Sequence, residues 1–394
     1  MSRPEIIVIG GGVIGSSITY YLSKMGKKVL MIEKKDNCSG SAGASDGVVG
    51  YHTKKPGLQM ELAIQSIAMF EELSKELGMD IEYRKDCGGM QPAETKLEWE
   101  ILSEIVKEQR KSGVDIRMIS IEEACKIEPQ LNPDLYGALY SPTSGKVNPI
   151  RLTFAYIQAA KRLGAQVLSN TEVTDVLVKM GRVMGVQTSR GVYYADQVID
   201  AAGSWAAEIA AMAGVDLPIR PRKGQLFITE PLGPFMDVTL QCARYNVIKF
   251  KPEAVGDKAV LRMGASLSIE QTENGGLVIG STREFAGYDR ENTLEAMEVT
   301  MRRAMRFFPA LKDVNIIRAF AGLRPFTPDG IPVIGEVEKL PGFFVAAGHE
   351  GDGIALAPIT GKLMAELLVQ GKSSYPLEAF SPNRFRRWSE GDFE

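Results

Sequence analysis

The pattern of apolar and polar residues near the N-terminus predicts a strand, a helix and a second strand in quick succession. Residues 6–9 are four consecutive apolar residues, and a glycine-rich turn at residues 10–15 separates them from a helical run. A second apolar run at residues 29–32 ends at Glu33. Short apolar runs bounded by glycine are typical of buried parallel strands, so we expect a β-α-β unit here.

Further along the chain, the spacing of apolar residues predicts a mixture of helices and short buried strands. Helical patterns cover residues 58–77, 96–110, 149–164, 294–308 and 354–368. Residues 120–123 form a capping box that opens a short helix before Pro129. Residues 173–194 are hairpin-like, and apolar runs predict strands at residues 166–168, 198–203, 332–335 and 343–348.

The pattern changes between residues 225 and 281. Strands alternate there with glycine and asparagine turns, of which residues 272–276 are the clearest, and this predicts an antiparallel sheet. At 394 residues the chain is longer than one core usually serves, so we expect two domains. Because no linker-like segment separates them, we expect the domains to be interleaved by several crossings of the chain.

Composition and charge exclude several classes of protein. The chain is 44% hydrophobic and 24% charged, as in globular proteins, and its net charge of −3 offers no binding surface for nucleic acid. We expect neither a transmembrane segment nor a signal peptide, since no apolar run approaches ~20 residues. Four cysteines without C-x-x-C spacing and two histidines predict a cytoplasmic protein without a metal site.

The glycine turn after the first strand is the first sign of a ligand. Gly10 permits a tight turn, Gly12 lets a pyrophosphate approach the backbone, and Gly15 lets the helix pack closely on the strand. The helix N-terminus offers free N–H groups to phosphates, and Glu33 stands where a carboxylate accepts hydrogen bonds from ribose hydroxyls. The pattern predicts a dinucleotide site and leaves NAD and FAD open. The expected contacts are Gly10, Gly12, Val13, Ile14, Gly15, Glu33 and Lys34.

Two later segments suit a longer, enclosed cofactor. Residues 201–205 end an apolar strand in residues small enough for close approach, and residues 348–354 place three glycines just before a helix. The free N–H groups of that helix would stabilise negative charge on the N1/C2 carbonyl edge of a reduced flavin. Taken alone, the second turn is also compatible with a plain loop that binds nothing.

Several further motifs follow the N-terminal fingerprint in order along nearly the whole chain. They are residues 147–149, 202–205, 280–284, 322–325 and 348–354. Together they resemble the D-amino-acid oxidase, glycine oxidase and sarcosine oxidase family of FAD-dependent amine oxidoreductases. Within that family, residues 45–47, 54–57 and 269–272 look closest to flavin subunits of multi-component dehydrogenases. These include hydrogen cyanide synthase, opine dehydrogenases and D-hydroxyproline or proline dehydrogenases.

The resemblance implies an α/β fold (α+β overall), in which a glutathione-reductase-like Rossmann FAD domain is interleaved with an antiparallel-sheet substrate domain. We expect residues 1–83, 145–223 and 317–394 in the FAD-binding domain, and residues 84–144 and 224–316 in the substrate domain. FAD would be bound non-covalently, and an iron–sulfur cluster or FMN would belong to a partner subunit. The further cofactor contacts implied are Ala44, Ser45, Asp46, Gly47, Val173, Ala202, Gly203, Trp205, Gly348, Gly351, Asp352, Gly353 and Ile354.

A carboxylate substrate needs a cationic anchor, and the arginine fork fits it. Arg324 matches the position at which glycine-oxidase-like enzymes hold the substrate carboxylate, with a structural ion pair as the alternative. Arg283 is a candidate second anchor, for which an ion-paired or solvated role is equally open. We expect His349 near the flavin, whether as a structural group or in direct contact with the reaction. Tyr245, Asn246 and Tyr140 are candidate pocket walls, with core or surface packing as the alternative for each.

Four residues near the small-residue loop leave their roles open. Some relatives attach flavin through histidine, but the motif around His52 does not match theirs. Lys54 and Lys55 are adjacent, so on an ordinary strand one should face solvent, and a contact of either with flavin, a second cofactor or a partner subunit is the alternative. Asp46 either lies near the reactive edge of the flavin or stabilises a turn.

These motifs predict an FAD-dependent enzyme that oxidises the C–N bond of a small amino or imino acid by hydride transfer to flavin N5. The substrate would be of the glycine, sarcosine, proline/hydroxyproline or D-amino acid type. Such chemistry needs positioning and exclusion of water rather than a nucleophile or metal. Oxidation of a 2-hydroxy acid or glycerol-3-phosphate on the same fold, and a non-catalytic flavin module, are the alternatives.

Overall fold

One half of the molecule is built on a six-stranded sheet. The computed structural model describes residues 3–85, 87–251, 258–385 and 388. In spatial order the strands are β18 (Val333–Glu336), β19 (Phe343–Ala347), β12 (Gln197–Asp200), β1 (Ile6–Ile9), β2 (Val29–Ile32) and β8 (Gln166–Leu168). All pairs are parallel except β18 with β19. Each residue of the central strands β1 and β2 is buried, because both faces of the sheet are covered.

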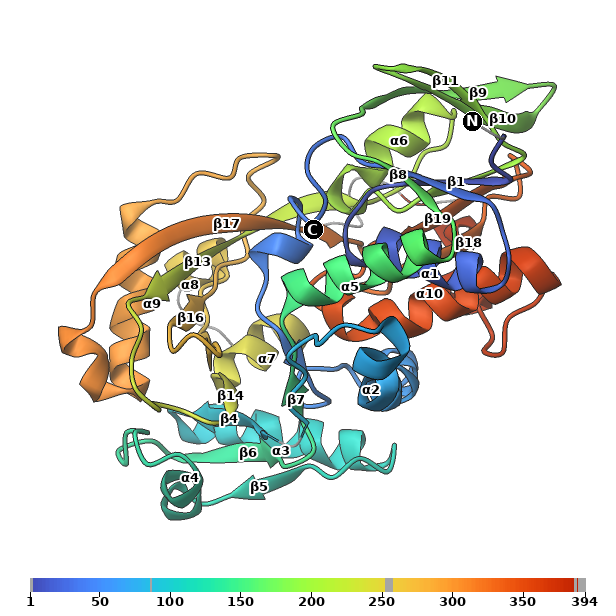
Figure 1. Cartoon of the computed structure of the whole chain (residues 1–394). Helices are drawn as coiled ribbons and strands as arrows, with labels where there is room; N and C mark the ends of the chain where they lie inside the picture. Colours follow the sequence, from blue (N-terminus) through green and yellow to red (C-terminus); the bar gives the residue numbers. More distant parts are fainter. Residues whose placement is uncertain (1–2, 86, 252–257, 386–387, 389–394) are drawn as a thin grey trace.

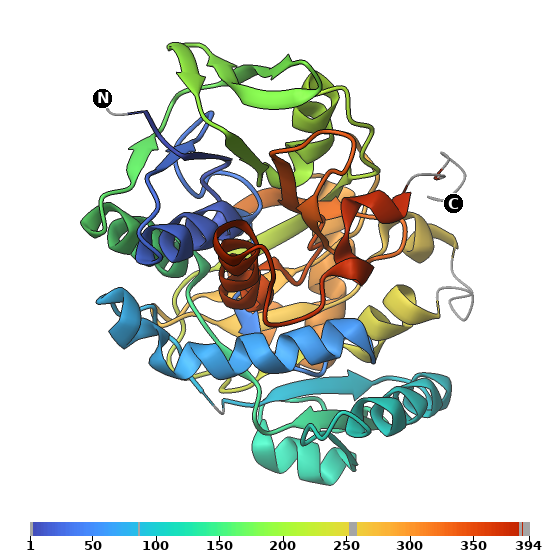
Figure 2. The ribbon, with the colours of Figure 1, turned by 90° about the vertical axis from the view of Figure 1, so that its right-hand side faces the viewer.

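Four helices cover one face of this sheet. They are α1 (Val13–Lys24), α2 (Leu58–Leu77), α5 (Pro149–Arg162) and α10 (Gly353–Gln370). Their apolar side chains form one core with Ile6, Val8 and Met31. Figure 2 shows α10 next to α1 and α2, with which it packs. Among the described helices, only α10 is long and apolar enough to span a membrane, and 61% of it is buried as in a core helix.

The opposite face is covered by a smaller sheet and a short helix. The strands β9 (Val173–Lys179), β10 (Arg182–Thr188) and β11 (Gly191–Tyr194) form an antiparallel meander, as the hairpin-like pattern predicts. With α6 (Ala206–Met212), they enclose a second core around Ile7, Leu30 and Val198. This three-layer arrangement is that of the predicted Rossmann-type half.

The other half is an eight-stranded sheet. In spatial order it contains β17 (Ile316–Phe326), β13 (Arg220–Thr229), β16 (Leu277–Gly280), β15 (Ser268–Gln271), β14 (Thr239–Gln241), β4 (Gly89–Ala93), β6 (Gly137–Ser141) and β5 (Arg117–Ile119). Its pairs are antiparallel apart from β14 with β4. This half of the molecule also contains the helices α3 (Lys96–Arg110), α4 (Ile121–Ile127) and α9 (Leu294–Phe307). The predicted antiparallel sheet is therefore present.

Residues 225–281 contain two helices that the strand-like pattern did not predict. These are α7 (Ala243–Phe250) and α8 (Lys258–Met263). In α7, Ala243 and Val247 are one helical turn apart and join a core with residues of α3. The helical signal is short, and the strand signals on both sides outweigh it. The prediction of strands throughout this segment was wrong.

The two halves share the long strands β13 and β17, which pair from Arg220–Phe326 to Thr229–Ile316. Figure 1 shows these strands reaching from the eight-stranded sheet towards the six-stranded one. The predicted boundary after residue 223 falls inside β13, and the boundary at residue 317 falls at the start of β17. The division into two domains at these residues stays a prediction. A small ribbon of β3 (Val48–Val49) and β7 (Gly145–Lys146) also lies between the halves.

Candidate active site

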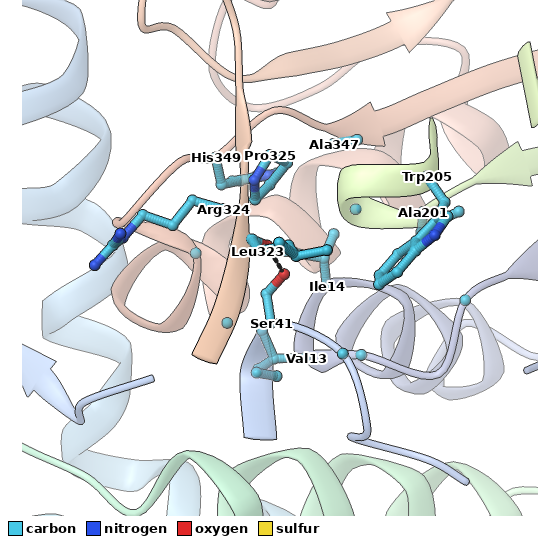
Figure 3. Close-up of a pocket in the computed structure, with 18 of the residues that line it drawn as sticks. Val13, Ile14, Ser41, Ala201, Trp205, Leu323, Arg324, Pro325, Ala347 and His349 are labelled. Carbon is cyan, nitrogen blue, oxygen red and sulfur yellow. Dashed lines mark hydrogen bonds between the residues drawn. The ribbon is translucent and has the colours of Figure 1, made fainter. Parts of the chain in front are cut away.

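A cavity of about 450 Å³ lies where the six-stranded sheet meets β13 and β17. Its wall is built from the β1–α1 turn, the end of β2, the 3₁₀ segment η1 (Ala42–Ala44), and the 3₁₀ segment η2 (Gly203–Trp205). The turn before α10 closes it. Figure 3 shows Trp205 and Arg324 on opposite sides of this space, with Ile14 and Leu323 between them. The cavity is therefore long, and its ends have different chemistry.

The three glycines of the β1–α1 turn differ in what surrounds them. Gly10 has φ +112°, and a Cβ there would lie 2.4 Å from the carbonyl oxygen of Ala201. A Cβ on Gly15 would lie 2.0 Å from the oxygen of Gly10, so helix and strand touch. A Cβ on Gly12 would meet nothing within 4 Å, because Gly12 faces the open cavity. Gly12 caps α1 without a side-chain hydrogen bond, so the first N–H groups of α1 are left for a ligand.

Glu33 lies at the same end of the cavity and is held by the backbone. Its carboxylate accepts hydrogen bonds from the N–H of Gly11 at 2.7 Å and of Lys35 at 2.9 Å. The neighbouring Lys34 forms an exposed ion pair with Glu172 at 2.7 Å. Glu33, Lys34 and Val173 all line the cavity. This end therefore offers a fixed carboxylate beside an open helix N-terminus, the arrangement that a ribose and pyrophosphate need.

Hydrogen bonds to one carbonyl join the middle of the cavity wall. Ser204 donates to the oxygen of Leu323 at 2.7 Å, and Ser41 donates to the same oxygen (Figure 3). Trp205 stacks on Tyr288, with ring centroids 5.6 Å apart and planes at 18°. Ala202 and Gly203 also line the wall. The strand β17 is thereby fixed against η1 and η2.

The turn before α10 forms the other end of the cavity. Gly351, Gly353 and Ile354 line it, and α10 begins without a side-chain cap. His349 also lines it and is buried, with Nε2 3.0 Å from Thr360 Oγ1. Burial lowers the pKa of His349 to about 4, against the opposing effect of Asp352, so the ring is neutral at pH 7. This end presents N–H groups and a neutral ring.

Three arginines gather beside this turn. Arg324 lines the cavity and donates to the carbonyl of Thr282 at 2.9 Å. It faces Arg222 across the β13–β17 pair, and Arg222 forms an ion pair with Glu350. Arg283 is buried, with its guanidinium 4.0 Å from the ring centroid of Tyr245. Its Nε lies 3.7 Å from Glu350, yet Nε and Nη2 have no hydrogen-bond partner among the described residues.

Most of the predicted site residues meet in this cavity. Those that line it are Gly10, Gly12, Val13, Ile14, Glu33, Lys34, Ala44, Ser45, Asp46, Val173, Ala202, Gly203, Trp205, Tyr245, Arg324, His349, Gly351, Gly353 and Ile354. Gly15, Gly47, Gly348, Asp352 and Arg283 stand behind its wall. Glu350 and Tyr288 also line it and were not predicted as site residues, although Glu350 lies inside the 348–354 motif.

The residues whose roles the sequence left open lie around this site. His52 is fully buried outside the cavity wall, with Nδ1 3.0 Å from Ser144 Oγ and Nε2 bonded to Gln241. Burial lowers the pKa of His52 to about 4. Lys54 is buried and forms an ion pair with Asp352 at 2.6 Å, whereas Lys55 is exposed.

The other two candidate wall residues lie elsewhere. Asn246 is buried behind Tyr245 and donates to the carbonyl of His52 at 3.1 Å. Tyr140 lies on β6, where Arg117 stacks over its ring at 5.3 Å. Neither lines the cavity. Tyr245 is the one member of this trio that does.

The fold and the site define a class of protein, the dinucleotide-binding oxidoreductases of Rossmann type with an antiparallel roof. The comparisons give the family: the model of the FAD dependent oxidoreductase family DAO matches residues 5–367. The chain therefore belongs to this family, and its cofactor is FAD. The resemblance inferred from the sequence motifs is confirmed.

Individual relatives match over nearly the whole chain. Hydrogen cyanide synthase subunit HcnC of Pseudomonas aeruginosa is 30% identical, over 97% of this chain and 96% of its own length. Glycine oxidase of Geobacillus kaustophilus is also 30% identical, over 97% of each chain. The crystal structure of L-proline dehydrogenase from P. horikoshii superposes with a TM-score of 0.87 at 31% identity, over 98% of each chain.

The residues of the site fit FAD. The open space above Gly12 accepts a pyrophosphate, and Gly351 and Gly353 line the cavity at the uncapped N-terminus of α10, where a flavin ring would lie. Each of these features is a property of this chain and independent of the comparisons. When bound, the flavin supplies the group that accepts a hydride from the substrate.

Proposed function

We propose that this FAD-dependent oxidoreductase oxidises the C–N bond of a small amino or imino acid, of the glycine, sarcosine, proline/hydroxyproline or D-amino acid type. The main support is the position of Arg324. Its side chain lines the cavity beside the Gly351–Gly353 turn, and it makes no ion pair within the residues that the structure describes. A guanidinium that lines a cavity and forms no ion pair with a described carboxylate suits a substrate carboxylate.

In this proposal FAD is non-covalent, with its ADP half against the β1–α1 turn and Glu33 and its ring against the turn before α10. His52 supports non-covalent binding, since both of its ring nitrogens are engaged away from the cavity. Asp352 acts indirectly, by fixing the turn through its buried pair with Lys54. Gly15, Gly47 and Gly348 likewise act through close packing of the backbone.

The substrate would lie between Arg324 and the wall formed by Tyr245. Arg324 binds the carboxylate, and Tyr245 limits the size of the group that can fit. Leu226 and Leu323 complete an apolar surround that excludes water from the reacting carbon. Arg283 adds positive charge from behind Tyr245. The residues thus position the substrate and leave bond breaking to the flavin.

A role as the flavin subunit of a heteromeric cytoplasmic dehydrogenase is the finer part of the proposal. Its support is the similarity to HcnC, which is named as a subunit. The partner would carry FMN or an iron–sulfur cluster, since the cysteines of this chain are scattered. Affinity purification from the native source, followed by metal and flavin analysis of co-purifying chains, tests this. A chain that purifies alone and reduces oxygen directly contradicts it.

An anaerobic screen of D- and L-amino acids tests the activity itself. The purified yellow protein should lose its visible flavin absorbance with glycine, sarcosine, proline or hydroxyproline. Bleaching by 2-hydroxy acids or glycerol-3-phosphate, with no response to any amine, would refute the proposed function. Reoxidation by air then separates an oxidase from a dehydrogenase.

A further inference from the structure

Asp46 is an acidic residue in the cavity wall that forms no ion pair with any described residue. It follows η1, lines the cavity and is half-buried. Its Oδ2 accepts a hydrogen bond from Ser268 Oγ at 2.8 Å. No ion pair joins it to a lysine, arginine or histidine in the part of the chain that the structure describes. The negative charge of Asp46 is therefore not neutralised by a salt bridge within the described residues.

The strand β15 holds Asp46 from behind. Ser268 and Glu270 are two residues apart on β15, so both face the loop of residues 45–47. Gln241 Nε2 donates to Ser268 Oγ at 3.3 Å, and Ser268 donates onward to Asp46. Glu270 Oε1 accepts from the N–H of Gly47 at 2.9 Å. The loop and the Asp46 carboxylate are thus fixed by a buried strand.

Glu270 also affects the charge of this group. Burial and the nearby Asp46 raise the pKa of Glu270, against the N–H of Gly47 and the charge of Lys146, and its Oε2 has no hydrogen-bond partner among the described residues. Burial thus disfavours a charge on Glu270, whereas Asp46 is the member of the pair that lines the cavity. Tyr245 from α7 and Arg283 from the segment after β16 are the other titratable groups that interact with Asp46.

The cavity therefore presents opposite charges that do not pair with each other. Asp46 lies on one element of its wall and Arg324 on another, and no ion pair joins them. An amino acid at neutral pH has one positive and one negative group on adjacent atoms. We propose that Asp46 binds the ammonium group of an α-amino acid whose carboxylate is bound by Arg324. This inference rests on the proposed function and narrows its substrate class to amino acids with a free, basic nitrogen.

Asp46 also gives the ammonium proton a place to go. Hydride transfer from the α-carbon needs the nitrogen lone pair, and the ammonium form has none available. One N–H bond of the ammonium breaks, the proton bonds to a carboxylate oxygen of Asp46, and the electron pair stays on nitrogen. No further reactant is needed for this step, and the charge of the site is unchanged overall. A hydroxy acid would gain only a neutral hydrogen bond from Asp46.

The test compares Asp46→Asn holoenzyme with the native enzyme on paired ligands. L-Proline is paired with tetrahydrofuran-2-carboxylate, and glycine with glycolate, since oxygen replaces nitrogen in each pair. Dissociation constants come from the perturbation of flavin absorbance, and reduction rates from anaerobic stopped flow. Flavin content per chain shows that each variant is folded. Asp313→Asn is the matched control, because Asp313 is exposed and lies outside the cavity wall.

We expect Asp46→Asn to weaken binding of the amino acid substrate, the one that reduces the native flavin, by at least tenfold. Binding of its oxygen analogue should weaken less than twofold. The pH at which reduction reaches half its maximal rate should rise. Arg324→Met should weaken binding of both the amino acid and its oxygen analogue. Should Asp46→Asn lose its flavin, Ser268→Ala keeps the charge while freeing the carboxylate, and it should show a smaller loss in the same direction.

If Asp46→Asn weakens binding of both ligands of a pair equally, or leaves the pH profile of reduction unchanged, the proposed role of Asp46 is overturned. A native enzyme that no amino acid reduces overturns the proposed function as well. In that second case the native flavin spectrum responds to no nitrogen-containing ligand. If only the inference about Asp46 fails, the native enzyme still turns over amino acids. The two failures can therefore be told apart.

Discussion

Two glycines three residues apart should respond in opposite ways to the same substitution. Gly12→Ala adds a methyl group to open cavity, at φ −78° and ψ −178°, which any residue adopts. Its cost to the apoprotein is that of replacing a glycine N-cap by alanine, below about 1 kcal/mol. Gly15→Ala places a methyl group 2.0 Å from a carbonyl oxygen, so the backbone must shift. Overpacking of this kind costs about 1–3 kcal/mol or more.

The effects on FAD should be reversed. The methyl group of Gly12→Ala occupies the space that the pyrophosphate needs, and we expect affinity to fall about 100-fold, or about 2.7 kcal/mol. At a free FAD concentration about 100 times the native Kd, native protein gains about 2.7 kcal/mol of stability from binding. The variant would gain only about 0.4 kcal/mol under the same conditions.

Urea unfolding of apoprotein and holoprotein measures both quantities, and quenching of flavin fluorescence gives the Kd directly. Gly233→Ala is the matched control, since a Cβ there also meets nothing within 4 Å but lies outside the cavity. Native FAD affinity in Gly12→Ala would refute the placement of the pyrophosphate. An apoprotein of Gly15→Ala as stable as the native one would refute the close contact of helix and strand.

Three further predictions concern charged and titratable groups. Arg324→Met should raise the KM for carboxylate substrates at least tenfold, whereas Arg318→Met, an exposed change on the same strand, should leave KM unchanged in steady-state assays. Asp352→Asn leaves the buried Lys54 without its partner and should cost about 3–5 kcal/mol in urea unfolding, while the double variant Lys54→Met/Asp352→Leu should recover most of that loss. His52 has a folded pKa of about 4, below its unfolded value of 6.5, so its contribution is complete above pH 6.5 and is lost as pH falls towards 4. Native protein should therefore lose about 2 kcal/mol more than His52→Gln between pH 7.5 and pH 5, and equal losses would contradict the burial of a neutral ring.

The dinucleotide half could be predicted because its signals are local. Gly10, Gly12 and Gly15 act within one turn, and the four-residue apolar runs reflect burial on both faces of a parallel sheet. The helix α7 was missed because its apolar spacing spans a single turn between two strand signals.

The substrate end was harder to predict, because its residues come from distant segments. Arg324 was identified through a motif, but its neighbour Arg222 depends on the register of β13 with β17. Glu350 sits at φ +49°, a conformation that its sequence does not indicate. The position of Asp46, which accepts a hydrogen bond from Ser268, depends on strand β15, more than 200 residues further along.

The packing of α10 on α1 also affects how the protein is made. Ser17 of α1 donates to the carbonyl of Ala357 at 2.8 Å. A side chain at position 361 of α10 would overlap Ser17, so the two helices can approach this closely only at a glycine. The helix α1, which leaves the ribosome first, therefore cannot complete its packing until α10, the last helix, has been made. Until about 370 residues have been translated, the fingerprint is complete in sequence and can pack with α5, but it lacks α10 and the turn before it. FAD must accordingly enter after synthesis, and a chain cut short before α10 would lose a cofactor site whose first motif it still contains.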